Sequence, residues 1–274
     1  MNHHVQNPNA IQILPLHFLV VHIKPLSPSS PPPPSPFPST TTTTTSSSSM
    51  TTDTVDKLVV FLAKRDGIDK LVKTFQYISK LIHFHTQSSH PSLANRFKQW
   101  ELSSGLSRKA FRSGRFLTGF NTLRRSPTVH THPFGILSIL SNAGEMVYFF
   151  FDHFLWLARV GVLDASLARR MSFISAFGES FGYIFFIIID FIIIKQGLKE
   201  EKRLKSMEIV NMEKVKNIRA DRVMRLMAIS ANLADLVIAV ADIEPNPFCN
   251  HAVTLGISGL VSAWAGWYRN WPSN

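Results

Sequence analysis

The spacing of apolar residues divides the chain into amphipathic helices followed by long apolar segments. Asp53 or Thr54 is placed to cap a helix that runs to about Lys64, and Gly67 interrupts the pattern. The helix expected after Gly67 carries one apolar stripe with a period near 3.6, which indicates an amphipathic helix. That stripe consists of Ile68, Leu71, Val72, Phe75, Ile78, Leu81 and Ile82.

Two further helices are expected before residue 126. Pro91 ends a connection and Ser92 is placed to cap the third helix. The fourth is expected from Leu106 to Phe120 as one amphipathic element. At 100° per residue its arginines fall within about 60° of one another, and its apolar residues fall on the other side. The arginines are Arg108, Arg112 and Arg115, and the apolar residues are Leu106, Ala110, Leu117 and Phe120.

Four apolar stretches follow, and each is a candidate membrane span. They cover about Phe134–Val162, Met171–Ile194, Val223–Ala241 and Ala252–Tyr268. A spanning helix needs about 20 mostly apolar residues. The second and fourth stretches fit best, because the first and third carry more charge. The pattern therefore predicts an all-α integral membrane bundle behind amphipathic N-terminal helices.

Polar residues recur along one side of each of the first three stretches and predict an intramembrane polar seam. Ionisable groups in lipid cost several kcal/mol unless they face one another, water or the bundle interior. The seam therefore has three possible interpretations. The first is structural pairing, for example of Arg225 with Glu145 or Glu179. The others are an ion or solute path along the seam and helices that are only partly embedded. Its residues are Glu145, Asp152, Glu179, Asp190, Arg225 and Asp235.

The fourth stretch carries small residues at helical spacing, which lets helix backbones approach closely. They are Gly256, Gly259, Ala263 and Gly266. This pattern is typical of packing within the chain or of oligomerisation.

The chain is both strongly basic and rich in apolar residues. The chain has 29 Lys and Arg against 18 Asp and Glu, a net charge of +11, and 21 Phe. Basic proteins bind anionic partners, and the Phe-rich second half argues for an anionic membrane and against nucleic acid. Residues 53–125 hold 14 Lys and Arg against 5 Asp and Glu. These helices are expected either to lie at a membrane surface or to pack as an ordinary bundle.

Residues 1–50 differ in composition from the rest. Ser27–Ser49 is almost only Ser, Pro and Thr, which bury too little apolar surface to offset the entropy of ordering. A transit peptide and a signal peptide are the alternatives to a disordered extension that precedes a start at Met50. We expect a disordered extension at 1–50, a basic amphipathic helical region at 51–126 and a membrane-embedded bundle at 127–274.

Loop charge predicts the orientation in the membrane. The loop at 195–222 carries nine Lys and Arg, so the positive-inside rule places it on the cytosolic side with both termini. The Arg169–Arg170 pair, in a turn expected on the other side, is the exception. The sequence has no phosphate-binding glycine loop, zinc-ligand spacing or nucleophile motif, so we expect no enzyme, cofactor or metal.

Five stretches resemble the plant peroxisomal membrane protein 11 (peroxin 11) family, most of all its B-type members. They are residues 53–58 (DTVDKL), 64–71 (KRDGIDKL), 105–112 (GLSRKAFR), 144–156 (GEMVYFFFDHFLW) and 256–271 (GISGLVSAWAGWYRNW). The resemblance runs from about Thr51 to the end of the chain. It implies elongation, proliferation and fission of peroxisomes, oligomerisation with family members, and recruitment of dynamin-type fission machinery and its membrane receptor.

The resemblance also implies a mechanism, in which an amphipathic helix of the front half inserts into one leaflet. Here the corresponding element is Leu106–Phe120, whose Ser113–Gly114 pair departs from the pattern and weakens the helix. The expected membrane-binding residues are Lys70, Lys73, Phe75, Leu106, Arg108, Lys109, Arg112, Arg115 and Leu117. The alternative function is a membrane channel or carrier that moves small metabolites along the polar seam.

Overall fold

The computed structural model describes residues 53–125, 133–206 and 212–272, and these residues form helices joined by turns, with no strand among them. The predicted all-α membrane fold is confirmed. The extension expected at 1–50 lies outside the described residues. The helices are α1 (Thr54–Leu62), α2 (Arg65–Thr86), α3 (Pro91–Phe111), α4 (Phe116–Arg125), α5 (Pro133–Arg159), α6 (Leu167–Lys205), α7 (Met212–Ile243) and α8 (Ala252–Asn270).

Local signals set the beginning of the front half. Asp53 caps α1 as expected: its side chain accepts a hydrogen bond from the Thr54 amide at 2.6 Å, and Asp56 accepts one from the Asp53 amide at 3.2 Å. Gly67 does not break a helix but lies in the first turn of α2. A Cβ there would lie 1.9 Å from the Phe61 carbonyl oxygen, so glycine permits the tight approach of α1 and α2.

The prediction of one helix from Leu106 to Phe120 was wrong. α3 runs unbroken from Pro91 to Phe111, with His90 rather than Ser92 at the N-cap position. Gly114 then adopts a φ of +73°, a left-handed conformation that ends a helix and that glycine adopts at low cost. α4 starts at Phe116 as a separate element. The residues of the predicted helix are therefore divided: Leu106, Arg108 and Ala110 lie on α3, and Leu117 and Phe120 lie on α4. Arg112 and Arg115 lie in the turn between the two helices.

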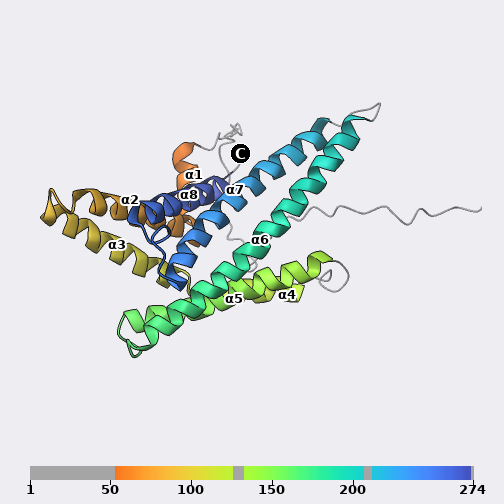
Figure 1. Ribbon diagram of the computed structural model, residues 1–274. Coiled ribbons are helices and arrows are strands. Elements are labelled where there is room, and N and C mark those ends of the chain that lie inside the picture. Colours follow the sequence, from red (N-terminus) through yellow and green to blue (C-terminus); the bar gives the residue numbers. More distant parts are fainter. Residues whose placement is uncertain (1–52, 126–132, 207–211, 273–274) are drawn as a thin grey trace, which may run out of the picture. The chain divides into compact units, whose positions relative to one another are not determined.

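Helices from the two halves of the chain pack together. α2 contacts α3 and α8, α4 contacts α5, and α5, α6, α7 and α8 contact one another in sequence order (Figure 1). α2 and α8 run antiparallel, since Gly256 lies against Leu81 and Gly266 lies against Lys70. The division at residues 126 and 127 stays a prediction, and the described helices on its two sides share one packed interior.

Three of the described helices, α5, α6 and α7, are long and apolar enough to cross a membrane. The expectation that the fourth apolar stretch is among the best spans was wrong by this measure, because α8 is not among the three. Its glycine, serine and tryptophan residues contribute little hydropathy, and Arg269 lies in its last turn. The less favoured first and third stretches qualify instead.

Candidate functional site

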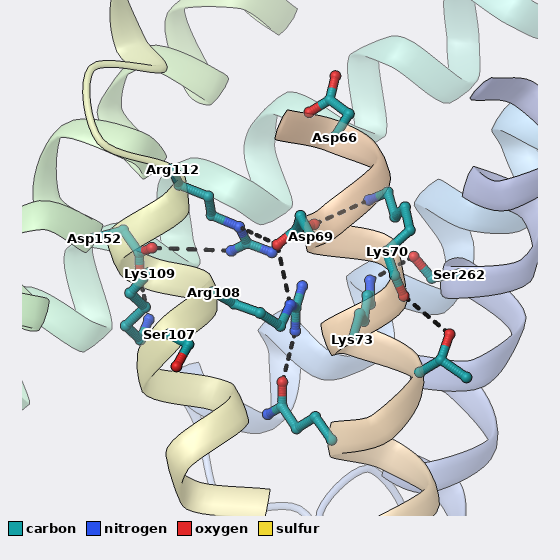
Figure 2. A network of polar contacts seen from close by, with 12 residues as sticks. Asp66, Asp69, Lys70, Lys73, Ser107, Arg108, Lys109, Arg112, Asp152 and Ser262 are labelled. Atoms are coloured by element: carbon teal, nitrogen blue, oxygen red, sulfur yellow. Dashed lines mark hydrogen bonds and ion pairs between the residues drawn. The ribbon is translucent and has the colours of Figure 1, made fainter. Parts of the chain in front are cut away.

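Asp69, near the start of α2, is the centre of a buried charge network. Its carboxylate is 1% exposed and accepts a hydrogen bond from Arg108 Nε at 3.1 Å (Figure 2). Arg112 Nε lies 3.3 Å from the same oxygen, and Arg108 also donates to Gln76 Oε1 at 2.8 Å. Arg108 lies in the last turn of α3, and Arg112 is its C-cap residue. The network therefore holds α2 and α3 together as a hairpin.

The same end of α3 also contacts α5. Lys109 Nζ donates a hydrogen bond to Asp152 Oδ1, and Arg112 donates one to the hydroxyl of Tyr148. Asp152 is 2% exposed. Lys109 and Arg112 therefore connect the front half to the first apolar helix.

A second cluster connects α2 to α7 and α8. Lys73 Nζ donates hydrogen bonds to Asp235 Oδ1 at 2.5 Å and to Ser262 Oγ at 2.6 Å. Ser262 in turn donates to Asp235 Oδ2 at 2.6 Å. Lys73 and Ser262 are almost fully buried, so this cluster joins three helices out of reach of solvent.

Burial and neighbouring charge perturb the groups on α2 and α3. Burial acts to raise the pKa of Asp69, but Arg108 and Arg112 outweigh it and hold the pKa well below its usual value. Burial lowers the pKa of Lys73 and of Lys109, and the partner carboxylates Asp235 and Asp152 oppose that shift. The network is an electrostatic connection between helices.

The structure divides the predicted membrane-binding residues into two groups. The cations turn inward, and their side chains are at most 25% exposed, where they pair with carboxylates; the group comprises Lys70, Lys73, Arg108, Lys109, Arg112 and Arg115. Of the apolar residues, Phe75 and Leu117 are exposed by 44% and 56%, and Leu106 is half-buried. Membrane contact stays a prediction for all of them.

The predicted polar seam is not one continuous row of pairs. Asp152 and Asp235 bind cations of the front half. Arg225 pairs with Asp190 at 2.9 Å and Asp221 at 2.7 Å, so the expected pairing of Arg225 with Glu145 or Glu179 was wrong. Glu179 accepts a hydrogen bond from the Tyr183 hydroxyl at 2.9 Å. For Glu145, the cation with the strongest electrostatic effect is Arg115.

The small residues of α8 form its contact with α2. A Cβ at Gly259 would lie 2.1 Å from the Tyr77 ring, and one at Gly256 would lie 2.4 Å from Leu81. Gly266 makes room for the Lys70 side chain, and Ala263 is fully buried. In the described structure this face therefore packs within the chain.

Two features of the site were not singled out in the sequence. The first is Asp69, which in the sequence resembles a solvent-exposed acid in a basic helix. The available signal was the charge imbalance of residues 53–125, where 14 cations share Asp69 and 4 other acids as possible partners.

The second feature is the crossing of α5 and α6. A Cβ at Gly144 would lie 2.5 Å from the Gly182 nitrogen. Gly178 and Gly182 form a GxxxG spacing, which was the available signal.

The comparisons with known proteins agree with the membrane fold. The family model of peroxisomal biogenesis factor 11 (PEX11) matches residues 55–271. Peroxisomal membrane protein 11-4 of Oryza sativa subsp. indica is 73% identical over 222 residues, which cover 81% of this chain and 98% of that protein. Peroxisomal membrane protein 11B of Arabidopsis thaliana is 68% identical over 228 residues, which cover 82% of this chain and 100% of that protein. No solved structure matches the chain.

Proposed function

Since the chain belongs to the peroxisomal biogenesis factor 11 (PEX11) family, we propose that it elongates the peroxisomal membrane and prepares it for fission. The chain is a peroxisomal membrane protein of this family, with three helices apolar enough to cross a bilayer. The proposed mechanism is insertion of front-half helices into one leaflet, combined with oligomerisation that concentrates them. Added area in one leaflet favours curvature toward that side.

The observation that carries this proposal is the exposed apolar surface of the front half. On the α2–α3 hairpin, Phe75 and Trp100 are exposed by 44% and 56%, and their ring centroids lie 6.1 Å apart. On α4, Leu117 and Phe120 are exposed by 56% and 53%, and Gly119 between them is buried against α5. Such surfaces are suited to the boundary between headgroups and acyl chains.

The charge network gives the cations a supporting role in this mechanism. We propose that Phe75 and Leu117 meet lipid directly, while Arg108, Lys109 and Arg112 hold the hairpin against the bundle. The alternative function, a solute path along the polar seam, has less support. Asp152 and Asp235, two carboxylates of that path, are occupied by cations of the front half.

The proposal includes partners and orientation. The chain acts as a homo- or hetero-oligomer with family members and recruits dynamin-type fission machinery through its membrane receptor. Both termini face the cytosol, the side from which such machinery acts, and this orientation requires the 19-residue helix α8 to cross the membrane as a fourth span. The chain shapes the membrane without catalysing a reaction.

The test replaces apolar residues of α4 in the full-length chain. We expect Leu117→Gln with Phe120→Gln to abolish tubulation of vesicles that contain anionic lipid, while the protein remains in the membrane after alkaline extraction. Removing two large apolar contacts with lipid costs about 3–6 kcal/mol of insertion free energy. Vesicle shape is followed by electron microscopy and helix content by circular dichroism.

The matched control makes the same chemical change outside the front half. Val162→Gln with Phe248→Gln alters residues exposed by 69% and 71% in the turns after α5 and α7. This variant is expected to tubulate vesicles like the wild type. Equal tubulation by the α4 variant and the wild type would show that insertion of α4 does not drive curvature.

A further inference from the structure

α6 is much longer than a membrane crossing requires. It runs unbroken for 39 residues, or about 58 Å at 1.5 Å per residue, whereas the hydrocarbon layer is about 30 Å thick. Its last residues therefore leave the membrane as a continuous helix. Together with the beginning of α7 they form an arm, here defined as residues 195–206 and 212–222.

One face of α6 has the pattern expected for contact with lipid. Between Phe173 and Phe191, its exposed large apolar residues are Phe173, Phe177, Ile184, Ile188 and Phe191, at 38–56% exposure. At 100° per residue these positions lie within about 60° of one another. From Phe173 to Phe191 they span about 27 Å along the helix, close to the hydrocarbon thickness.

Three lysines continue this face beyond Phe191. Lys195, Lys199 and Lys202 lie within about 60° of the centre of the apolar stripe. All three are exposed, and none of their side chains has a hydrogen bond or ion pair with another residue in the part of the chain that the structure describes. Arg203 and Lys205 differ, because Arg203 pairs with Glu200 at 2.8 Å and Lys205 pairs with Glu201 at 3.0 Å.

Contacts across the arm keep the three lysines on the outer side. Glu201 accepts from Arg219 at 2.9 Å and pairs with Arg222 at 3.0 Å, both on α7. Leu204 and Val215 are 5% and 3% exposed. The inner face of the arm is therefore occupied, and the lysine face cannot rotate inward without breaking these contacts.

The direction of the lysine side chains brings their charges back toward the membrane. Along a helix each Cα–Cβ bond tilts toward the N-terminus, which for α6 is the membrane side. Lys195, Lys199 and Lys202 follow Phe191 by about 6, 12 and 16 Å. The headgroup layer is about 5–7 Å thick, and charges within about 8 Å of it still interact at physiological salt. Their flexible side chains extend the reach of the ammonium groups toward the headgroups.

We propose that Lys195, Lys199 and Lys202 form a binding face for anionic phospholipid headgroups, in the leaflet where α6 leaves the membrane. The face is separate from the front-half helices and does not depend on their insertion. It would collect anionic lipid around the bundle and fix the depth of α6. Its partner is the lipid of the membrane that the chain itself crosses.

The test uses the full-length chain reconstituted in phosphatidylcholine vesicles with a trace of spin-labelled phosphatidylserine or spin-labelled phosphatidylcholine. Electron paramagnetic resonance measures the fraction of each lipid that the protein immobilises. We expect the wild type to prefer phosphatidylserine, and Lys195→Gln, Lys199→Gln and Lys202→Gln together to reduce that preference by at least about two-fold. Circular dichroism checks that the helix content is unchanged.

The matched variant keeps the charge and changes the residue type. Lys195→Arg, Lys199→Arg and Lys202→Arg together are expected to retain the preference of the wild type. A glutamine variant that still prefers phosphatidylserine as strongly as the wild type would overturn the proposal. Loss of the preference in the arginine variant would also overturn it, because the charge would then not be the determinant.

Discussion

Asp69 is one acid among many basic residues, and its surroundings determine what its removal costs. It is almost fully buried and faces two guanidinium groups. Asp66, one turn earlier on α2, pairs with Arg115 at 2.8 Å but its side chain is 43% exposed. Solvent screens the second pair far better than the first.

We expect Asp69→Asn to lower the free energy of unfolding by about 3–5 kcal/mol, because two buried arginines lose their shared counter-charge. Asp66→Asn removes the same charge from the same helix and should cost at most about 1 kcal/mol. Thermal unfolding of the full chain in detergent micelles compares the two variants. Similar losses in both would show that burial of Asp69 does not determine its contribution.

The lowered pKa of Asp69 predicts a pH dependence with a definite sign. In the unfolded chain Asp69 titrates near pH 3.9, and in the fold it titrates well below its usual value. Its stabilising contribution is therefore complete above about pH 5 and is lost as the pH falls through the lowered pKa. The difference in stability between wild type and Asp69→Asn should shrink from pH 5 toward pH 2. If the stability difference between the two proteins did not change from pH 5 to pH 2, the lowered pKa of Asp69 would be contradicted.

At the scale of elements, the contact between α2 and α8 depends on backbone proximity. We expect Gly259→Ala to destabilise the fold by about 1–3 kcal/mol, because its methyl group would collide with the Tyr77 ring. Gly197→Ala in α6 meets only Ile218 at 3.5 Å and should be neutral or stabilising by up to about 1 kcal/mol. Unfolding midpoints of the two variants, measured in the same micelles, should move in opposite directions or differ clearly in size.

Elements with local signals were predictable from the sequence, and elements that depend on distant partners were not. The Asp53 cap requires only its neighbours, and the amphipathic stripe of α2 is visible in its own spacing. The break at Gly114 was underestimated, because a glycine in a helical pattern ends the helix only when its φ is positive. The partners of Lys73 and Lys109 lie more than 40 residues away, so no local pattern identifies them.

At the scale of the whole molecule, labelling of Cys249 tests the orientation of the chain in the membrane. It lies between α7 and α8, after three helices that are able to cross the membrane. If α5 begins on the cytosolic side, Cys249 should face the interior of the peroxisome. We expect a membrane-impermeant maleimide to label it only after the organelle membrane is permeabilised.

A cysteine placed on the arm provides the control. Lys202→Cys in a Cys249→Ala background should be labelled in intact organelles, because the arm is proposed to face the cytosol. Equal labelling of Cys249 in intact and permeabilised organelles would contradict the proposed orientation or the number of crossings before it.

The contact between Lys73 and Ser262 joins residues that are 189 positions apart in the chain. A ribosome that adds 5–20 residues per second needs about 10–40 s to make that intervening stretch. During this time the cations of α2 already exist and their partners on α7 and α8 do not. The first hairpin to be synthesised therefore completes its native contacts only after α8 has been made. Loss of α8 would consequently leave α2, near the beginning of the described chain, without part of its native contacts.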